Sequence, residues 1–251
     1  NIAGLGTLFV NENFITKIAK YLYKYSQSKA KFVFFQNNED FELFTSEKLV
    51  DKNKCGILPG SGVDTNKFTP IENTNKDEKI RFLLISRMLW DKGIQEYIDA
   101  ARELKKKYTN LEFQLLGFLD VSNKTAISKD QMDKWVKEDI VNYLGVSNNV
   151  KVEISNCDCI VLPSFYRAVT KLVKTFPDNN IGCKDVVDHE INGYLCEVKN
   201  SQDLAIQMEK IVELSNEERI SMGQKGRAKI INEFEETIVI DKYLDAIEKI
   251  L

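Results

Sequence analysis

Histidine is almost absent from this sequence of 251 residues, which contains only His189. A single imidazole argues against zinc sites that need several histidines and against a Ser-His-Asp triad. Four prolines and twelve glycines are too few for a collagen-like or low-complexity chain. No run of about 18 apolar residues occurs, so no membrane-spanning helix is predicted. These absences leave an ordinary globular protein whose hydrophobic fraction of 43% suffices for a core.

The net charge and the cysteines further narrow the class of protein to which this sequence can belong. The net charge is −3, which argues against general nucleic-acid binding. We interpret the five cysteines as reduced thiols of a cytoplasmic protein: Cys55, Cys157, Cys159, Cys183 and Cys196. Cys157 and Cys159 resemble a ligand pair, but no second pair completes a site, so no metal is predicted. Because the first residue is Asn1, we expect the sequence to be part of a longer product.

Short apolar, β-branched runs alternate with helical patterns, which is typical of a parallel α/β fold. The expected strands are 31–36, 56–58, 80–85, 113–116, 140–144, 159–162 and 194–198. The expected helices include 13–29, 94–108, 202–214, 217–234 and 237–251. The polar run NTNKDE at 73–78 indicates an interdomain linker. We therefore predict an incomplete first domain (1–72), a second domain (73–234) and a C-terminal helix (235–251) that packs back on the first.

The most informative stretch is SRMLWDKG at 86–93, which joins the end of one expected strand to the start of a helix. Open α/β sheets bind ligands at this edge, and a helix N-terminus attracts phosphate through its unpaired N–H groups. Arg87 and Lys92 add positive charge there, and Gly93 allows the backbone to approach a ligand closely. The alternative is a solvated loop with incidental charges. Because the sequence has only six arginines, the position of Arg87 favours a function.

Three further loops follow expected strands and carry residues suited to a ligand. GSG at 60–62 allows a tight, amide-rich turn through Gly60 and Gly62. Gly117 ends the strand 113–116, and the segment 163–167 places Ser164 and Arg167 after the strand 159–162. Each signal is weak alone, but together the four loops favour one ligand site along the sheet edge.

The order of these motifs resembles glycosyltransferase family 4. The matching segments are GSGVD (60–64), SRMLWDKG (86–93), LLG (115–117), YLG (143–145), CDCIVLPSFYR (157–167) and GCKDVVDHEINGYL (182–195). The resemblance implies a retaining enzyme of bacterial glycan assembly with the GT-B fold, in which two Rossmann-like domains enclose a UDP-sugar. It implies that Arg87 and Lys92 hold the donor diphosphate without a metal ion or other cofactor. It also implies that Gly60 and Gly62 line the cleft, and that the backbone at Tyr143 and Leu144 meets the uracil.

One departure from the family pattern follows Arg167. The family continues with two glutamates that contact the donor sugar and its ribose, whereas this sequence has Ala168 and Phe176 at those positions. Either the natural chain has lost this loop, or the loop is missing from the sequence as given. We expect the second, so that the Cα atoms of Arg167 and Ala168 lie farther apart than the ~3.8 Å of bonded neighbours. No catalytic residue is assigned.

The helix 13–29 permits two interpretations. Its lysines and tyrosines are Lys17, Lys20, Lys24, Tyr21, Tyr23 and Tyr25, with Lys31 just beyond it. They form either a solvated helix face or a docking surface for anionic lipid at the inner face of the cell membrane.

The resemblance predicts an enzyme that transfers a hexose or N-acetylhexosamine from a UDP-sugar to a glycan acceptor carried on a lipid. Two alternatives stay open. The chain is either an inactive module that binds a nucleotide-sugar or a partner, or a UDP-sugar epimerase of the same fold.

Overall fold

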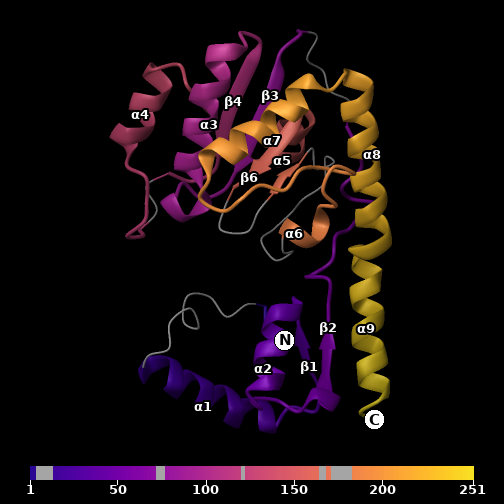
Figure 1. Ribbon diagram of the computed structural model, residues 1–251. Helices are drawn as coiled ribbons and strands as arrows, with labels where there is room; N and C mark the ends of the chain where they lie inside the picture. Colours follow the sequence, from indigo (N-terminus) through magenta and orange to yellow (C-terminus); the bar gives the residue numbers. More distant parts are fainter. Residues whose placement is uncertain (4–13, 72–76, 120–121, 164–167, 171–182) are drawn as a thin grey trace. The chain divides into compact units, whose positions relative to one another are not determined.

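The computed structural model describes residues 1–3, 14–71, 77–119, 122–163, 168–170 and 183–251 (Figure 1). Contacts within the chain divide it into two compact units. Unit 1 holds the described residues among 1–65 and 231–251, and unit 2 holds those among 66–176 and 183–230. Most of the linker predicted at 73–78 lies outside the described residues.

Unit 2 is built on a sheet with the strand order β5-β4-β3-β6-β7. The strands are β3 (Ile80–Ile85), β4 (Leu111–Leu116), β5 (Asn142–Tyr143), β6 (Cys159–Leu162) and β7 (Ala168–Thr170). β3 to β6 run parallel, and β7 is antiparallel to β6. β3 reads IRFLLI and is buried from Ile80 to Leu84, as expected for a central parallel strand covered on both faces.

Helices lie around this sheet, as Figure 1 shows. They are α3 (Ile94–Lys107), α4 (Lys129–Lys137), α5 (Val150–Ser155), α6 (Cys183–Val186), α7 (Ser201–Glu213) and α8 (Asn216–Glu233). The apolar stripe predicted for α3 is buried, and it includes Ile94, Tyr97, Ile98, Ala101 and Leu104. The hydroxyl of Tyr97 donates to the carbonyl of Phe82 at 2.9 Å, so α3 is fixed to β3 by a buried hydrogen bond as well as by packing.

Unit 1 contains a parallel pair of strands and the helices around it. Its elements are α1 (Phe14–Ser28), β1 (Val33–Phe35), α2 (Asn38–Ser46), a 3₁₀ turn η2 (Lys52–Lys54), β2 (Cys55–Ile57) and α9 (Glu236–Glu248). Phe35 and Phe44 are fully buried, with ring centroids 5.3 Å apart. The C-terminal helix α9 packs on this unit, where the ring of Tyr243 meets that of Phe34 at 4.8 Å.

The prediction of a strand at 194–198 is wrong. Tyr194 and Cys196 are buried, so the alternation that suggested a strand is present. However, the N–H of Leu195 donates to His189 Nδ1 at 3.0 Å and the N–H of Glu197 donates to Asp203 Oδ2 at 2.5 Å. Because side chains satisfy these backbone donors, the segment needs no neighbouring strand.

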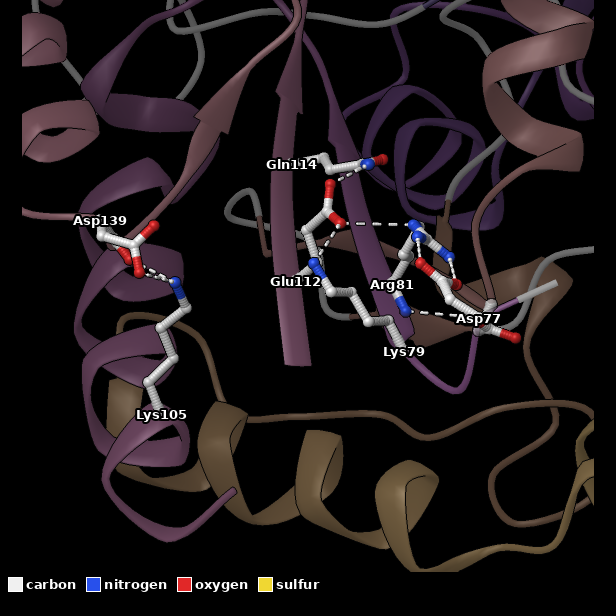
Figure 2. Close-up of polar contacts among 8 residues, drawn as sticks. Asp77, Lys79, Arg81, Lys105, Glu112, Gln114 and Asp139 are labelled. Carbon is white, nitrogen blue, oxygen red and sulfur yellow. Dashed lines mark hydrogen bonds and ion pairs between the residues drawn. The ribbon is translucent and has the colours of Figure 1, made fainter. Parts of the chain in front are cut away.

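A buried arginine stabilises the amino end of the sheet (Figure 2). Arg81 is 8% exposed and donates to both carboxylate oxygens of Asp77, at 2.8 and 2.5 Å. Its Nε also lies 3.4 Å from Glu112 on β4, whose other oxygen accepts a hydrogen bond from Gln114. The Arg81 guanidinium holds the pKa of the Asp77 carboxyl below its usual range. This network fixes the start of β3 at the edge opposite to the predicted ligand loops.

Candidate functional site

The loop between β3 and α3 is held by two buried apolar residues. Met88 and Leu89 are 0% and 1% exposed, and the Met88 N–H and C=O bond to Phe118 and Ile127 at 2.9 and 3.0 Å. Arg87 precedes this anchor and is exposed. The anchor thus fixes the backbone and leaves the guanidinium facing solvent. The exposed Trp90 ring packs edge-on against Trp135 at 5.9 Å.

Lys92 ends a 3₁₀ turn, η3 (Trp90–Lys92), directly before α3. Gly93 adopts the left-handed conformation (φ 73°) and forms the N-cap of α3. Within the ranges that the structure describes, neither the Arg87 guanidinium nor the Lys92 ammonium forms an ion pair with a carboxylate. Two cations and a helix N-terminus therefore lie within one short loop, an arrangement that suits an anion.

Backbone contacts join this loop to two neighbouring strand ends. A Cβ on Gly93 would lie 2.3 Å from the carbonyl oxygen of Pro163, which follows β6. A Cβ on Gly117, which follows β4, would lie 1.9 Å from the carbonyl oxygen of Ser86. Both positions therefore require glycine. The structure thus brings together the ends of β3, β4 and β6, three of the four strand ends that the sequence analysis placed on one sheet edge. The fourth prediction is wrong, because the strand before Gly60 belongs to the separate sheet of unit 1.

Tyr143 and Leu144 contact the same group of loops. The hydroxyl of Tyr143 donates to the carbonyl of Gly117 at 2.8 Å, and the Gly117 N–H donates to the carbonyl of Gly145 at 2.7 Å. The N–H of Leu144 continues the β ladder to Leu115 at 2.8 Å, and its side chain packs on the apolar cluster around Leu116. Some backbone groups predicted to meet a base are therefore already bonded within the protein.

Gly60 and Gly62 belong to unit 1, whereas the loops above belong to unit 2. Both have positive φ, 80° and 83°. A Cβ on Gly62 would lie 2.6 Å from the Cα of Glu236, so this glycine lets the start of α9 approach the turn. Packing within unit 1 already explains the need for glycine at this position.

A polar side chain beside this turn was not singled out by the sequence analysis. Gln36 is 6% exposed, and its Nε2 lies 3.4 Å from the hydroxyl of Ser61. Its Oε1 is buried without a hydrogen-bond partner among the described residues. An unpaired buried amide oxygen costs roughly 1–3 kcal/mol, so Gln36 is a candidate for a contact with a ligand. From the sequence, only its place at the end of the expected strand 31–36 could have indicated this.

Ser164 and Arg167 lie outside the described residues, and so does Phe176. The expected separation of the Arg167 and Ala168 Cα atoms therefore stays a prediction. On the described side, Ala168 pairs with Leu162 across the antiparallel β6–β7 ladder. Five residues connect these two positions in the sequence.

A hollow of about 830 Å³ lies elsewhere on unit 2, at the amino edge of the sheet. Its lining includes Lys79, Lys105, Glu112 and Asp139, which Figure 2 shows among their ion pairs. Lys105 pairs with Asp139 at 3.2 Å, and the Lys79 ammonium lies 4.0 Å from Glu112. No residue predicted to bind the donor lines this hollow. Its charges largely neutralise one another, so they do not define a ligand.

Packing and hydrogen bonding account for the surroundings of His189 and of the described cysteines. His189 Nδ1 accepts the Leu195 N–H, and the ring packs edge-on against Tyr194 at 5.9 Å. Cys157, Cys159 and Cys196 are buried, and Cys55 is half-buried. Among the residues described, no group of three His, Cys, Asp or Glu residues is placed to hold a metal ion.

Comparison with known proteins identifies the domain that carries these loops. Residues 66–178 match the family Glycosyl transferases group 1. The resemblance carried by the motifs is confirmed, and the matched segment contains Arg87, Lys92, Gly93 and Gly117.

Two curated relatives come from bacterial glycan assembly. The N,N'-diacetylbacillosaminyl-diphospho-undecaprenol alpha-1,3-N-acetylgalactosaminyltransferase of Campylobacter jejuni is 27% identical over 274 residues, covering all of this chain and 70% of that protein. The capsular polysaccharide biosynthesis glycosyltransferase CapM of Staphylococcus aureus is 25% identical over 215 residues, covering 77% of this chain and 55% of CapM. The first alignment spans more residues than this chain has, so that relative carries segments without a counterpart here.

Solved structures confirm the fold class. A glycosyltransferase from Rickettsia africae ESF-5 has a TM-score of 0.74 at 19% identity, covering 92% of this chain and 67% of that one. Anabaena Alr3699/HepE in complex with UDP-glucose has a TM-score of 0.71 at 16% identity, covering 94% and 67%. The chain therefore has an α/β fold with parallel sheets of the GT-B glycosyltransferase type. It spans 55–70% of the lengths of the four proteins described above.

Proposed function

We propose that this chain is the donor-binding part of a retaining glycosyltransferase. The enzyme moves a hexose or N-acetylhexosamine from a UDP-sugar to a glycan acceptor linked to a lipid, in the cytoplasm at the inner face of the cell membrane. The family match supports sugar transfer. The UDP-glucose complex of one neighbour supports the donor, and the name of the Campylobacter relative supports the acceptor.

The observation that carries the proposal is the loop 86–93. It combines two cations, neither paired with a carboxylate among the described residues, with the N-terminus of α3. When the bond between the sugar C1 and the phosphate oxygen breaks, negative charge develops on the departing diphosphate. Arg87 and Lys92 stabilise that charge without a metal ion, an electrostatic contribution that is often the largest in catalysis. As the acceptor oxygen bonds to C1, its proton passes to the departing diphosphate, which leaves as UDP.

UDP binding tests the site directly. We expect Arg87→Ala and Lys92→Ala each to weaken UDP binding by about 1.5–3 kcal/mol in isothermal titration calorimetry, the range for hydrogen bonds to charged groups. The matched control is Arg102→Ala, because Arg102 lies beside the hollow at the amino edge and pairs with Asp99 and Glu138 there. If all three variants lost the same amount of UDP affinity, or if none lost any, Arg87 and Lys92 would not be the residues that bind the diphosphate.

Turnover distinguishes the enzyme from a binding module. The full-length protein should release UDP from UDP-hexoses or UDP-N-acetylhexosamines when a saccharide linked to a polyprenyl diphosphate is supplied. Epimerase activity would appear instead as an isomerised UDP-sugar formed without the acceptor.

The inactive module is the second candidate, and the hairpin of β6 and β7 favours it. Ala168 pairs directly with Leu162, so the short connection closes the sheet without the segment that carries the family's two glutamates. This candidate predicts UDP binding with no turnover for any donor. Sequencing the natural transcript across the codons of Arg167 and Ala168 decides whether the loop is absent from the protein.

A further inference from the structure

An acidic residue lies inside the loop that carries the two cations. Asp91 directly precedes Lys92 and follows Arg87 by four residues, and it stands two residues before Gly93, the N-cap of α3. A carboxylate at this position can pair with either cation or with the N–H groups of the helix N-terminus. A diphosphate needs the same partners. The loop therefore binds an anionic ligand well only if its own carboxylate is held elsewhere.

A threonine on a neighbouring segment holds this carboxylate. The hydroxyl of Thr125 donates to Asp91 Oδ1 at 2.5 Å, and both residues are half-buried. The same hydroxyl lies 3.0 Å from Asn123 Oδ1, but it has a single proton, and the contact with Asp91 is the shorter one. A hydrogen bond to an ionised acceptor is stronger than one between neutral groups. The Asp91 carboxylate is therefore committed to Thr125.

Backbone bonds place the Thr125 hydroxyl independently of its side chain. The carbonyl of Thr125 accepts the Trp90 N–H at 2.8 Å, and the Ile127 N–H donates to the carbonyl of Met88 at 3.0 Å. The Thr125 N–H donates to Asn123 Oδ1 at 2.9 Å. An isolated antiparallel bridge joins the two segments between these bonds. A substitution that removes only the hydroxyl should therefore leave the segment in place.

The N-terminus of α3 is not capped by a side chain, because its N-cap is Gly93. The first turn of the helix contains one carboxylate, Glu96, three residues beyond the N-cap. The Thr125 hydroxyl bonds to Asp91 and not to Glu96. Glu96 thus offers a second acidic side chain beside the same helix N-terminus that does not depend on the threonine.

We propose that Thr125 is a positioning residue for the donor diphosphate. Its hydroxyl keeps Asp91 away from Arg87, Lys92 and the start of α3, so that their positive charge is available to the ligand. Without the hydroxyl, the Asp91 carboxylate turns to these groups and competes with the diphosphate. This inference rests on the proposed function and deepens it, since it names a residue that controls donor affinity without touching the donor.

Isothermal titration calorimetry with UDP and the full-length protein tests the role of Thr125. Thr125→Val keeps the shape of the side chain and should raise the Kd for UDP about threefold to tenfold, because the ligand must displace a carboxylate from cations and a helix N-terminus. Thr125→Ser keeps the hydroxyl and should bind UDP like the unchanged protein. Asp91→Asn should lower the Kd by a larger factor in the Thr125→Val background than in the unchanged protein. Structural damage caused by the valine would not be repaired in this way.

The matched control is Glu96→Gln, which removes a neighbouring carboxylate that Thr125 does not hold. It should change the Kd for UDP by the same factor in the two backgrounds. The inference is overturned if Thr125→Val binds UDP as tightly as the unchanged protein, or if Asp91→Asn and Glu96→Gln restore its binding equally. A loss of binding in Arg87→Ala without one in Thr125→Val overturns this inference alone. If the unchanged protein does not bind UDP, the proposed function falls with it.

Discussion

Gly93 and Pro163 meet so closely that a Cβ on the glycine would lie 2.3 Å from the proline carbonyl oxygen. The first residue precedes α3 and the second follows β6, so the contact joins two strand ends that are far apart in the sequence. It fixes the position of the loop that carries Arg87 and Lys92. The candidate site thus depends on the shape of the backbone as much as on its charged side chains.

This contact gives a first prediction. Gly93→Ala should destabilise the protein by about 3 kcal/mol, because it combines a left-handed residue with a backbone clash. Gly145→Ala is the matched control, since Gly145 has nearly the same φ (72°) but no atom within 4 Å of the added Cβ. It should cost only about 1–2 kcal/mol. Urea unfolding measures both, and equal losses would contradict a specific role for the contact with Pro163.

The buried arginine at the amino edge gives a second prediction. Arg81→Met should cost about 2–3 kcal/mol, because it leaves Glu112 and the half-exposed Asp77 without their common partner. Lys79→Met removes a 53% exposed ammonium that lies 4.0 Å from Glu112. It should change the free energy of unfolding by less than about 1 kcal/mol. A similar loss in both variants would show that the network adds no more than an ordinary surface ion pair.

The unpaired amide of Gln36 gives a third prediction. Gln36→Leu should leave stability unchanged or raise it by about 1 kcal/mol, because it removes a buried acceptor that has no partner. It should nevertheless lower the rate of UDP release during transfer. Gln207→Leu is the control, since Gln207 on α7 has a similar unpaired Oε1 and bonds to Asp203 through its Nε2. Equal rates in the two variants would mean that the Gln36 amide has no function.

Stability should fall in acid. Hydrogen bonds from Arg81, Lys107 and Ser215 lower the pKa values of Asp77, Glu209 and Glu218, respectively. A lowered folded-state pKa stabilises the protein above the unfolded value, here 3.8 for aspartate and 4.5 for glutamate. That stabilisation is lost as the pH falls through the folded values.

We therefore expect a constant urea midpoint from about pH 5 to 7 and a decline below about pH 4.5. Asp77→Asn should make the decline shallower. If the urea midpoint of this variant declined in acid as steeply as that of the unchanged protein, Asp77 would not contribute to the loss of stability.

The sequence predicted the central elements of unit 2 well and its margins less well. The bounds of β3 and β6 were predicted to the residue, because continuous apolar runs of this length occur in strands buried on both faces. Helix α4 was not predicted, since its first turn, Lys129–Gln131, is polar and only Met132 and Trp135 are buried. At 194–198 the alternation of buried residues is present. However, the backbone N–H groups of Leu195 and Glu197 donate to side chains and not to a neighbouring strand.

The chemistry of the candidate site was determined by the sequence alone. Arg87, Lys92 and the glycines near them are local features, since a strand, a loop and a helix start can be recognised from neighbouring residues. Tertiary structure alone decided which of these glycines meet another backbone, that Gln36 is buried with an unpaired oxygen, and that α1 turns its apolar face outward. These features depend on residues distant in the chain. Hydrophobic periodicity shows that a helix has an apolar face but not which face the protein covers.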